Sequence, residues 1–409
     1  IVPGNLLLKQ WEDNLIDFFG EKINILIVNS NNPTWDKNLF IFSKTSQEMG
    51  LRIILASDKS AILPRFIDNL HDPNGENLFL IADEVHDLAA YENKNFLEKI
   101  NPKYRLGLSA TPERYMDPEG TNFLLTYFTK ILEPEFSLKD ALNADPPVLS
   151  DYNYDFSEVF FTAEEEEEFI LYTKKISKLY ARIKQTKDNK DLKIQYKNLL
   201  MKRADLSKEA NGKINKVYDI LNENYDPKEK QFWVVYCNNN DHIDQITERL
   251  SNNSKFDTPL IYTSKKINKD SSSLEFFIQN GGILLAVDML DQGIDIPRID
   301  HAIFIASSRN ERQFIQRRGR VLRRHPKKVI ANIFDTIVLP SENIVTKNPN
   351  QNNNEFLGHI TMELIRGIEF AKSAKNSGIE YILKNIATRY NIDIDQLIID
   401  DDSAINVED

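Results

Sequence analysis

Residues 83–86 read Asp-Glu-Val-His and directly follow the apolar run LFLIA. Paired carboxylates in such a place suit metal-assisted phosphoryl chemistry, since one can hold Mg²⁺ through water while the other orients or deprotonates an attacking water. A polar turn after a strand would explain two acids alone. The histidine and the Ser-Ala-Thr tripeptide at 109–111 favour the functional interpretation. We therefore take Asp83, Glu84 and His86 as candidate catalytic residues.

Two further strand candidates end in residues that suit a ligand site. Ser109 and Thr111 follow the next apolar run, where small hydroxyls can bond neighbouring loops without filling a cleft, although such residues also cap helices. The segment VDMLDQGIDIP turns at Gly293, with Asp295 two residues later. Glycine permits close approach of the backbone to a ligand, and an acid can accept a ribose hydroxyl. The plain alternative here is a glycine turn.

A basic segment, QRRGRVLRR at 316–324, stands in a chain whose net charge is −11. At about 100° per residue, Gln316, Arg320 and Arg323 share one side of a helix. The apolar side chains gather opposite, at Phe314, Ile315, Val321 and Leu322. Arg318 falls among them, so either its stem reaches the edge of that face or the helix begins later. A nucleic-acid-binding helix explains the charge, and two arginines directed at a triphosphate also explain the spacing.

Short apolar runs alternate with helix-like stretches and must position these residues. In the first part of the chain we expect buried strands at 23–28, 51–57, 77–83 and 104–111. In the second part we expect strands within KQFWVVYC, TPLIYTS, GGILLAV, HAIFIAS and VIANIFDTIVL. Such alternation predicts an α/β protein with parallel sheets covered on both faces.

Composition shifts divide the chain into four parts. Residues 1–145 form the first α/β domain. Residues 146–230 open with the proline-marked stretch DPPVLSDYNYDF, continue with helical periodicity, and are predicted to be a helical connector. Residues 231–345 form the second α/β domain. Residues 346–409 are a tail, predicted to hold two helices within 356–390.

Overall composition restricts the function classes. A chain of 409 residues with 41% hydrophobic content can build more than one core. The single cysteine, Cys237, excludes a disulfide framework and a multi-cysteine zinc site and fits the reducing cytoplasm. Neither a signal sequence nor an apolar run long enough to span a membrane occurs in the sequence.

Together these segments resemble the motifs of the superfamily 2 helicases and translocases, in the branch with DEVH boxes and sixth motifs of the QRxGRxLR type. This branch includes XPB/Rad25-like DNA helicases and the motor subunits of bacterial restriction and phage-defence systems. The segments occur in the family's order over residues 1–340. They are VPGNLLLKQW for motif Ia, DEVH for II, SAT for III, FWVVYCNNNDHIDQI for IV, VDMLDQGIDIP for V and QRRGRVLRR for VI.

The resemblance implies two tandem RecA-like domains, each with three α/β/α layers, and ATP bound between them with Mg²⁺ on Asp83. It implies that Glu84 activates water and that His86, Ser109 and Thr111 couple hydrolysis to nucleic-acid contact. The remaining implied contacts are Gly293 and Asp295 with nucleotide, Gln316, Arg320 and Arg323 with phosphates, and Pro3, Gly4 and Asn238 with a nucleic-acid backbone. The implied partner is double-stranded DNA, with a nuclease domain or subunit outside this chain.

Two departures from the family pattern bear on activity. The sequence contains no G-x-x-x-x-G-K-[ST] loop, which in the family precedes motif Ia and holds the β- and γ-phosphates. We expect that this loop lies upstream of Ile1, in a longer parent protein, and that the isolated chain is inactive without it. Val287 stands where many relatives have threonine. Two alternatives remain open: a nucleic-acid-binding module that does not hydrolyse ATP, and an RNA helicase.

Overall fold

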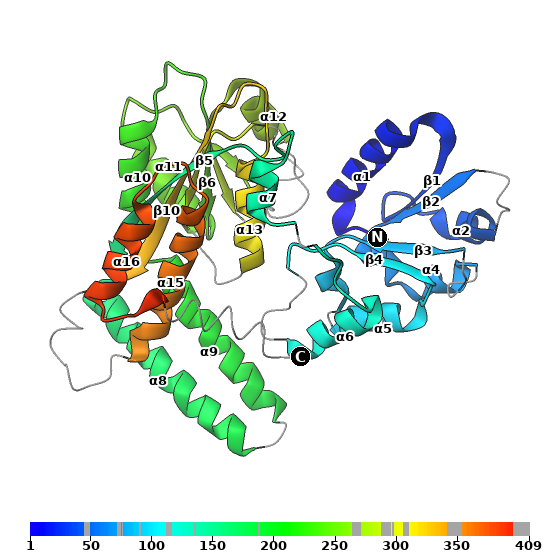
Figure 1. The fold of residues 1–409 in the computed structure, drawn as a ribbon, viewed down its shortest axis with the longest axis horizontal. Helices are drawn as coiled ribbons and strands as arrows, with labels where there is room; N and C mark the ends of the chain where they lie inside the picture. Colours follow the sequence, from blue (N-terminus) through cyan, green and yellow to red (C-terminus); the bar gives the residue numbers. More distant parts are fainter. Residues whose placement is uncertain are drawn as a thin grey trace. The chain divides into compact units, whose positions relative to one another are not determined.

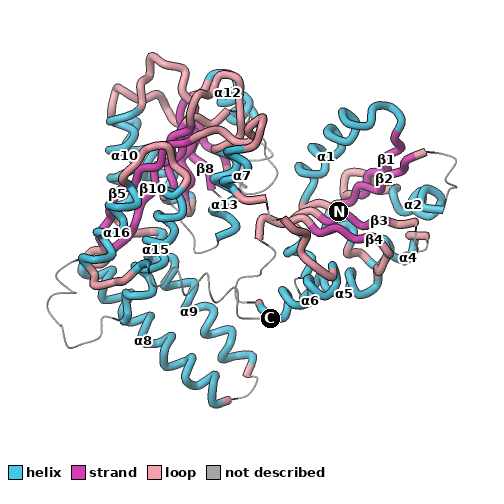
Figure 2. Tube along the Cα trace, in the orientation of Figure 1, coloured by secondary structure: helices cyan, strands magenta, loops and turns pink. Residues whose placement is uncertain are grey.

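The computed structural model describes residues 1–44, 50–71, 75, 77–89, 91–111, 117–134, 136–186, 189–263, 271–287, 296, 298–305, 311–341 and 354–395. These residues divide into two compact units, the first made mainly of residues 1–135 and the second of most of residues 136–409. In both units the strands are parallel and helices pack against them (Figures 1 and 2). None of the helices in the described ranges is long and apolar enough to cross a membrane.

The first unit contains the four strands predicted for it: β1 (Ile23–Val28), β2 (Leu51–Ala56), β3 (Phe79–Ala82) and β4 (Tyr104–Gly107). β1 pairs with β2 and β3 pairs with β4. Val2 donates to the Ala56 carbonyl, and the Asp83 amide donates to the Ile1 carbonyl. The first two residues therefore lie between β2 and β3.

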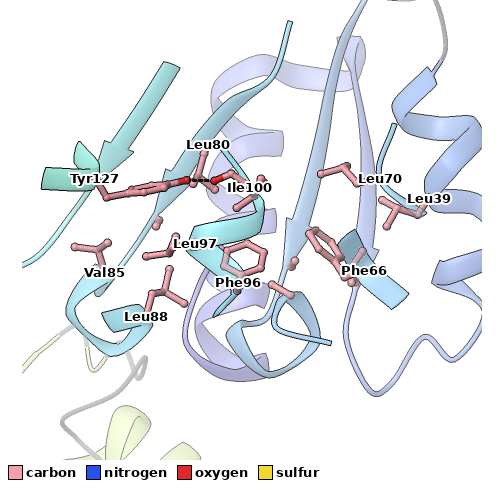
Figure 3. Packing of buried hydrophobic residues seen from close by; sticks show 14 of the residues in the cluster. Leu39, Phe66, Leu70, Leu80, Val85, Leu88, Phe96, Leu97, Ile100 and Tyr127 are labelled. Atoms are coloured by element: carbon pink, nitrogen blue, oxygen red, sulfur yellow. Dashed lines mark hydrogen bonds between the residues drawn. The ribbon is translucent and has the colours of Figure 1, made fainter. Parts of the chain in front are cut away.

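Six α-helices and two short 3₁₀ helices complete the described part of the first unit. They are α1 (Gly4–Phe19), η1 (Gly20–Lys22), α2 (Trp35–Lys44), α3 (Asp58–Ala61), α4 (Pro64–Asn69), η3 (Val85–Ala89), α5 (Tyr91–Lys99) and α6 (Pro118–Phe128). Leu8 of α1 packs on Leu55 on one side of the sheet. The other side holds the larger core, which contains Phe66, Phe96, Leu97 and Leu80 of β3 (Figure 3).

The second unit is built on a six-stranded parallel sheet in the order β5-β10-β9-β6-β8-β7. Its strands are β5 (Tyr152–Phe160), β6 (Phe232–Cys237), β7 (Leu260–Tyr262), β8 (Gly282–Val287), β9 (His301–Phe304) and β10 (Ala331–Leu339). Its described helices are α7 (Leu138–Asn143), α8 (Ala163–Gln185), α9 (Lys190–Lys208), α10 (Gly212–Asn224), α11 (Asn240–Ser251), α12 (Ser271–Asn280), α13 (Glu311–Val321), α15 (Asn354–Lys372) and α16 (Ile379–Arg389).

Alternate residues of β6 show the three layers of this unit. Trp233 and Val235 join the cluster made by α10 and α11 on one face. On the other face, Tyr236 stacks on Phe304, which in turn contacts Phe370 of α15. Every residue of β6 is buried, as expected for a strand covered on both sides.

The predicted connector is wrong for one segment, because Tyr152–Phe160 forms β5 and pairs with the whole length of β10. Tyr152 and Tyr154 are both fully buried, and the Tyr152 hydroxyl donates to the Phe370 carbonyl. The alternation of buried and exposed side chains typical of a strand was concealed by the prolines before it and by its polar residues. Only α8, α9 and α10 correspond to the helical stretch that the sequence predicted.

A buried ion cluster joins α15 to β10. The Arg366 guanidinium donates to Asp335 Oδ2 at 3.2 Å and to both carboxylate oxygens of Glu363, at 2.6 and 3.1 Å. Asp335 is fully buried and Glu363 is 6% exposed. Burial alone would raise the pKa of Glu363, but the charges of Arg366 and His359 lower it to about 2. The two predicted C-terminal helices are present, and α15 belongs to the core of this unit.

Candidate active site

The chain turns sharply between β3 and η3, and this turn carries the predicted catalytic residues. Ala82 and Val85 are 0% and 5% exposed, so both ends of the turn are anchored in the core (Figure 3). Asp83 and Glu84 lie between these anchors, beyond the carboxyl end of β3. Ligands of open parallel sheets bind beyond the carboxyl ends of strands, so the carboxylates have the placement that the sequence predicted.

Asp83 has a hydrogen-bond donor at each carboxylate oxygen. Oδ1 accepts from the Glu84 amide at 3.0 Å, and Oδ2 accepts from the Trp11 indole Nε1 at 2.9 Å. Two donors on different oxygens fix the plane of the carboxylate, and each oxygen still has a lone pair for a further ligand. Sequence reasoning missed Trp11, which is 72 residues away.

Glu84 has a positive φ of 47°, in the left-handed region that non-glycine residues rarely adopt. Such conformations cost roughly 1–3 kcal/mol and persist where the surroundings enforce them, often at functional sites. Here the Asp87 amide donates to the Glu84 carbonyl and the Val85 amide donates to the Leu108 carbonyl. These bonds hold the glutamate in the turn, with its Oε2 3.4 Å from His86 Nδ1.

His86 connects the two strand ends. Its side chain is buried, and Nδ1 lies 3.2 Å from Ser109 Oγ, while Nε2 lies 3.2 Å from Asp87 Oδ1. The Ser109 hydroxyl donates to the Thr111 carbonyl at 2.7 Å, so its oxygen is left to accept from Nδ1. Both ring nitrogens face acceptors, and the ring donates on both sides when it carries both protons. The structure thus brings His86, Ser109 and Thr111 together and adds Asp87 to the group.

Close packing of β4 on η3 makes this arrangement possible. A Cβ added to Gly107 would lie 3.1–3.3 Å from side-chain atoms of Val85. A side chain at position 107 would require Val85 to move by a few tenths of an ångström.

The side chains around Asp83 fit a magnesium ion shared with a nucleotide better than a preformed metal cage. Across the described residues, no group of three or more His, Cys, Asp or Glu side chains could hold a metal ion. Mg²⁺ in phosphoryl-transfer sites is bound by one or two carboxylates, with water and substrate phosphates as its other ligands. Asp83, with hard oxygen ligands and a fixed orientation, meets this requirement.

The basic segment differs from the predicted helix at its end. α13 covers Gln316 and Arg320 but stops at Val321, so Arg323 is not on the helix and the stripe of three is wrong at its third member. The Leu322 amide donates the last helical hydrogen bond, to the Arg318 carbonyl at 2.9 Å, and the Leu322 carbonyl accepts from the Ser150 amide at 2.7 Å. The buried Lys328 ammonium donates to the Val321 carbonyl at 2.8 Å and also to that of Arg323.

Arg323 therefore lies in extended chain, where its backbone forms an antiparallel bridge with Leu149, and its side chain is exposed. Two other arginines of the segment are used for packing. The Arg317 guanidinium lies 5.2 Å from the Tyr236 ring centroid, and that of Arg318 lies 5.2 Å from the Phe370 centroid. α13 begins before Gln316, so the alternative of a later helix start is excluded and Arg318 reaches over an aromatic ring.

The predicted nucleic-acid contacts are divided between the two units. Pro3 directly precedes α1, and Gly4 is the first residue of the helix, with φ 72° and a backbone amide that donates to Asp58 Oδ1 at 3.2 Å. Asn238 follows β6, and its side-chain Nδ2 donates to Glu209 Oε1 at 3.0 Å. The predicted nucleotide contacts Gly293 and Asp295 lie outside the described residues.

Two family models match separate parts of the chain. The family described as "Type III restriction enzyme, res subunit" matches residues 1–114, and "Helicase conserved C-terminal domain" matches residues 212–325. Together the two ranges hold more than half of the chain, and every candidate residue lies within one of them. The chain therefore belongs to the superfamily 2 helicases and translocases.

Individual relatives include both DNA and RNA enzymes. The DNA 3'-5' translocase XPB2 of Sulfurisphaera tokodaii is 27% identical over 61% of this chain and 57% of its own length. The ATP-dependent RNA helicase eIF4A of Eremothecium gossypii is 30% identical over 28% of this chain and 29% of its own length. This chain thus matches only part of either relative.

Among solved structures, the DNA-bound ATP-dependent Type ISP restriction-modification enzyme LlaBIII superposes with a TM-score of 0.55. The match is 15% identical and covers 92% of this chain and 27% of that one. The fold class predicted from the sequence, tandem RecA-like α/β domains, is confirmed.

Proposed function

We propose that this chain is the motor part of an ATP-dependent DNA helicase or double-strand DNA translocase, in a bacterial restriction, phage-defence or repair system. The names of two similar proteins, a DNA translocase and a DNA-bound restriction-modification enzyme, support DNA as the substrate. The similarity to eIF4A supports RNA as the second candidate. A nuclease partner outside this chain belongs to the same proposal.

The observation that carries the proposal is the hydrogen-bonded link from the carboxylate turn to the end of β4. Asp83 is oriented by two donors, and His86 bonds Ser109 across the two strand ends. When bound, Mg²⁺ would neutralise phosphate charge and polarise the reacting phosphoryl group. Asp83 would hold the ion, and Glu84 would orient an attacking water and accept its proton.

The remaining roles follow the same reasoning. Arg320 and Arg323 carry planar guanidinium groups suited to charge on transferring phosphates, and Gln316 lies one turn before Arg320 on α13. Gly293 and Asp295 are proposed to contact the nucleotide. Pro3, Gly4 and Asn238 are proposed to follow a nucleic-acid backbone, where contacts to phosphate are salt-sensitive and largely independent of sequence.

A basic helical hairpin in the second unit supports a nucleic-acid partner. α8 and α9 pack against each other as a long pair (Figure 1), and residues 174–203 contain eleven Lys and Arg against two Asp. Lys174, Lys175 and Lys178 are exposed on α8. Concentrated positive charge on an acidic protein is the electrostatic pattern expected for binding a phosphate backbone.

The experiment measures ATP hydrolysis and nucleic-acid binding separately. Because the 409 residues lack the phosphate loop, turnover is measured in the full-length gene product and binding also in the isolated chain. Glu84→Gln is expected to lower nucleic-acid-stimulated turnover by about 10²–10⁴-fold while binding is retained. Undiminished turnover would refute the role of Glu84.

The choice of substrate is tested with duplex DNA, single-stranded DNA and RNA of equal length. If duplex DNA stimulates ATP hydrolysis more than the other two nucleic acids, the result supports a translocase. If RNA alone stimulates hydrolysis, the result identifies an RNA helicase. Tight binding without turnover by any of the three would favour a module that does not hydrolyse ATP.

A further inference from the structure

Trp11 is the only side chain of α1 for which the described structure gives a hydrogen bond to the catalytic turn. Its indole N–H donates to Asp83 Oδ2 at 2.9 Å, and both residues are partly buried. The bond joins the helix that follows Pro3 and Gly4 to the carboxylate proposed to hold Mg²⁺. None of the proposed catalytic steps uses this tryptophan.

The bond fixes the orientation of the Asp83 carboxylate, and metal binding depends on that orientation. Only one side-chain group, the Trp11 indole, and one backbone amide, that of Glu84, orient the Asp83 carboxylate through the bonds described. Groups that hydrogen-bond a metal ligand from outside set its orientation, and their removal typically costs 10–100-fold in metal affinity or activity. Without the indole donor, the Asp83 carboxylate could rotate and carry Oδ2 away from the ion.

α1 can transmit a displacement from its start to this bond. Trp11 lies seven residues after Gly4 in one uninterrupted helix, about 10 Å along its axis. On its inner side, Trp11 packs in the cluster that contains Leu8 and Leu55. A shift at the start of the helix therefore moves the indole against Asp83, because a helix moves as a rigid element more readily than it bends.

We infer that Trp11 is a positioning residue that couples nucleic-acid contact at the start of α1 to the orientation of Asp83. The inference rests on the proposed function, since it takes Pro3 and Gly4 as nucleic-acid contacts and Asp83 as the Mg²⁺ carboxylate. It adds a route within the first unit by which binding of a nucleic-acid backbone changes the orientation of the Mg²⁺ carboxylate.

Fluorine NMR with 5-fluorotryptophan tests this inference directly. The chain has three tryptophans, Trp11, Trp35 and Trp233, and a Trp11→Phe variant assigns the Trp11 resonance. The other two are 1% and 0% exposed, which makes them internal controls. Asp83→Ala removes the acceptor and is expected to shift the Trp11 resonance alone. An unmoved resonance would refute the hydrogen bond.

A short DNA duplex is then added while binding is followed in parallel by fluorescence anisotropy. We expect the Trp11 resonance to move on binding in the wild type and the Trp35 and Trp233 resonances to stay in place. Binding with an unmoved Trp11 resonance would overturn the inference and leave the proposed function intact. Absence of any binding would overturn the proposed function, and the coupling with it.

A second measurement separates positioning from a general structural effect. In the full-length protein, Trp11→Phe keeps the ring but loses the donor, and is expected to raise about tenfold the Mg²⁺ concentration that half-saturates hydrolysis. Trp233→Phe is the matched control, since it removes an indole N–H bonded to Gln231 Oε1 at 2.9 Å in the second unit. Equal effects of the two variants would contradict a specific role for Trp11.

Discussion

Replacement of Arg366 by methionine is expected to destabilise the second unit strongly. The guanidinium lies between Asp335 of β10 and Glu363 of α15, and it also donates to the Thr336 carbonyl at 3.3 Å. Methionine preserves much of the side-chain length but none of the charge. The variant would leave two buried carboxylates facing each other without a cation between them.

The burial of these groups sets the magnitude. Asp335 is 0% exposed, Glu363 is 6% exposed and Arg366 is 9% exposed, so water cannot replace the lost partner. Removing one member of a buried ion pair costs about 3–5 kcal/mol, because the remaining charge is desolvated and uncompensated. We therefore expect the free energy of unfolding of this unit to fall by that amount in Arg366→Met.

The matched control is Arg389→Met, the same substitution at an exposed pair. Arg389 contacts Glu158 at 2.5 Å, and their side chains are 38% and 28% exposed. Exposed pairs contribute roughly 0–1 kcal/mol. Urea unfolding is followed by the fluorine resonance of Trp233, which reports the sheet of the second unit and not the first. If the two variants unfold at the same urea concentration, the cluster does not stabilise this unit as we reason.

Two further predictions concern the arginine segment and the response to acid. In the full-length protein, Arg320→Ala and Arg323→Ala are each expected to lower hydrolysis by about 10³-fold or more if they contact phosphates in transfer; weaker DNA binding with unchanged DNA-independent hydrolysis would instead indicate a plain nucleic-acid-binding segment. Burial lowers the pKa of His301 from 6.5 to about 4, so the unfolded chain takes up its proton first and stability declines as pH falls from 6.5 to 4. Urea titrations of His301→Gln over this range should give a flatter pH dependence than those of the wild type.

The parts that could be predicted from the sequence are those that depend on local pattern. The four strands of the first unit are continuous apolar runs, and the Asp-Glu-Val-His turn follows one of them. Both the type of these elements and their positions in the sequence could therefore be predicted. Parallel pairing then places the ends of β3 and β4 side by side, which accounts for the contact of His86 with Ser109.

Other features depend on contacts distant in the sequence. The bond from Trp11 to Asp83 spans 72 residues, and no spacing rule connects the two. The end of α13 depends on Lys328 and Ser150, whose bonds to the segment after Arg320 replace the next helical turn. A helical projection of the arginines cannot include such partners, so it extended the helix to Arg323.

The position of β5 has a consequence for dividing this protein into fragments. β5 comes before the helical hairpin in the sequence but lies at the edge of the second sheet, where its nine residues cover β10. A fragment started at residue 212 or 231 would lack β5 and expose the backbone of β10. An uncovered strand edge can pair with other chains, and such a fragment would be prone to aggregate. Expression of the second domain alone should therefore begin before Tyr152, so that the sheet keeps its own edge strand.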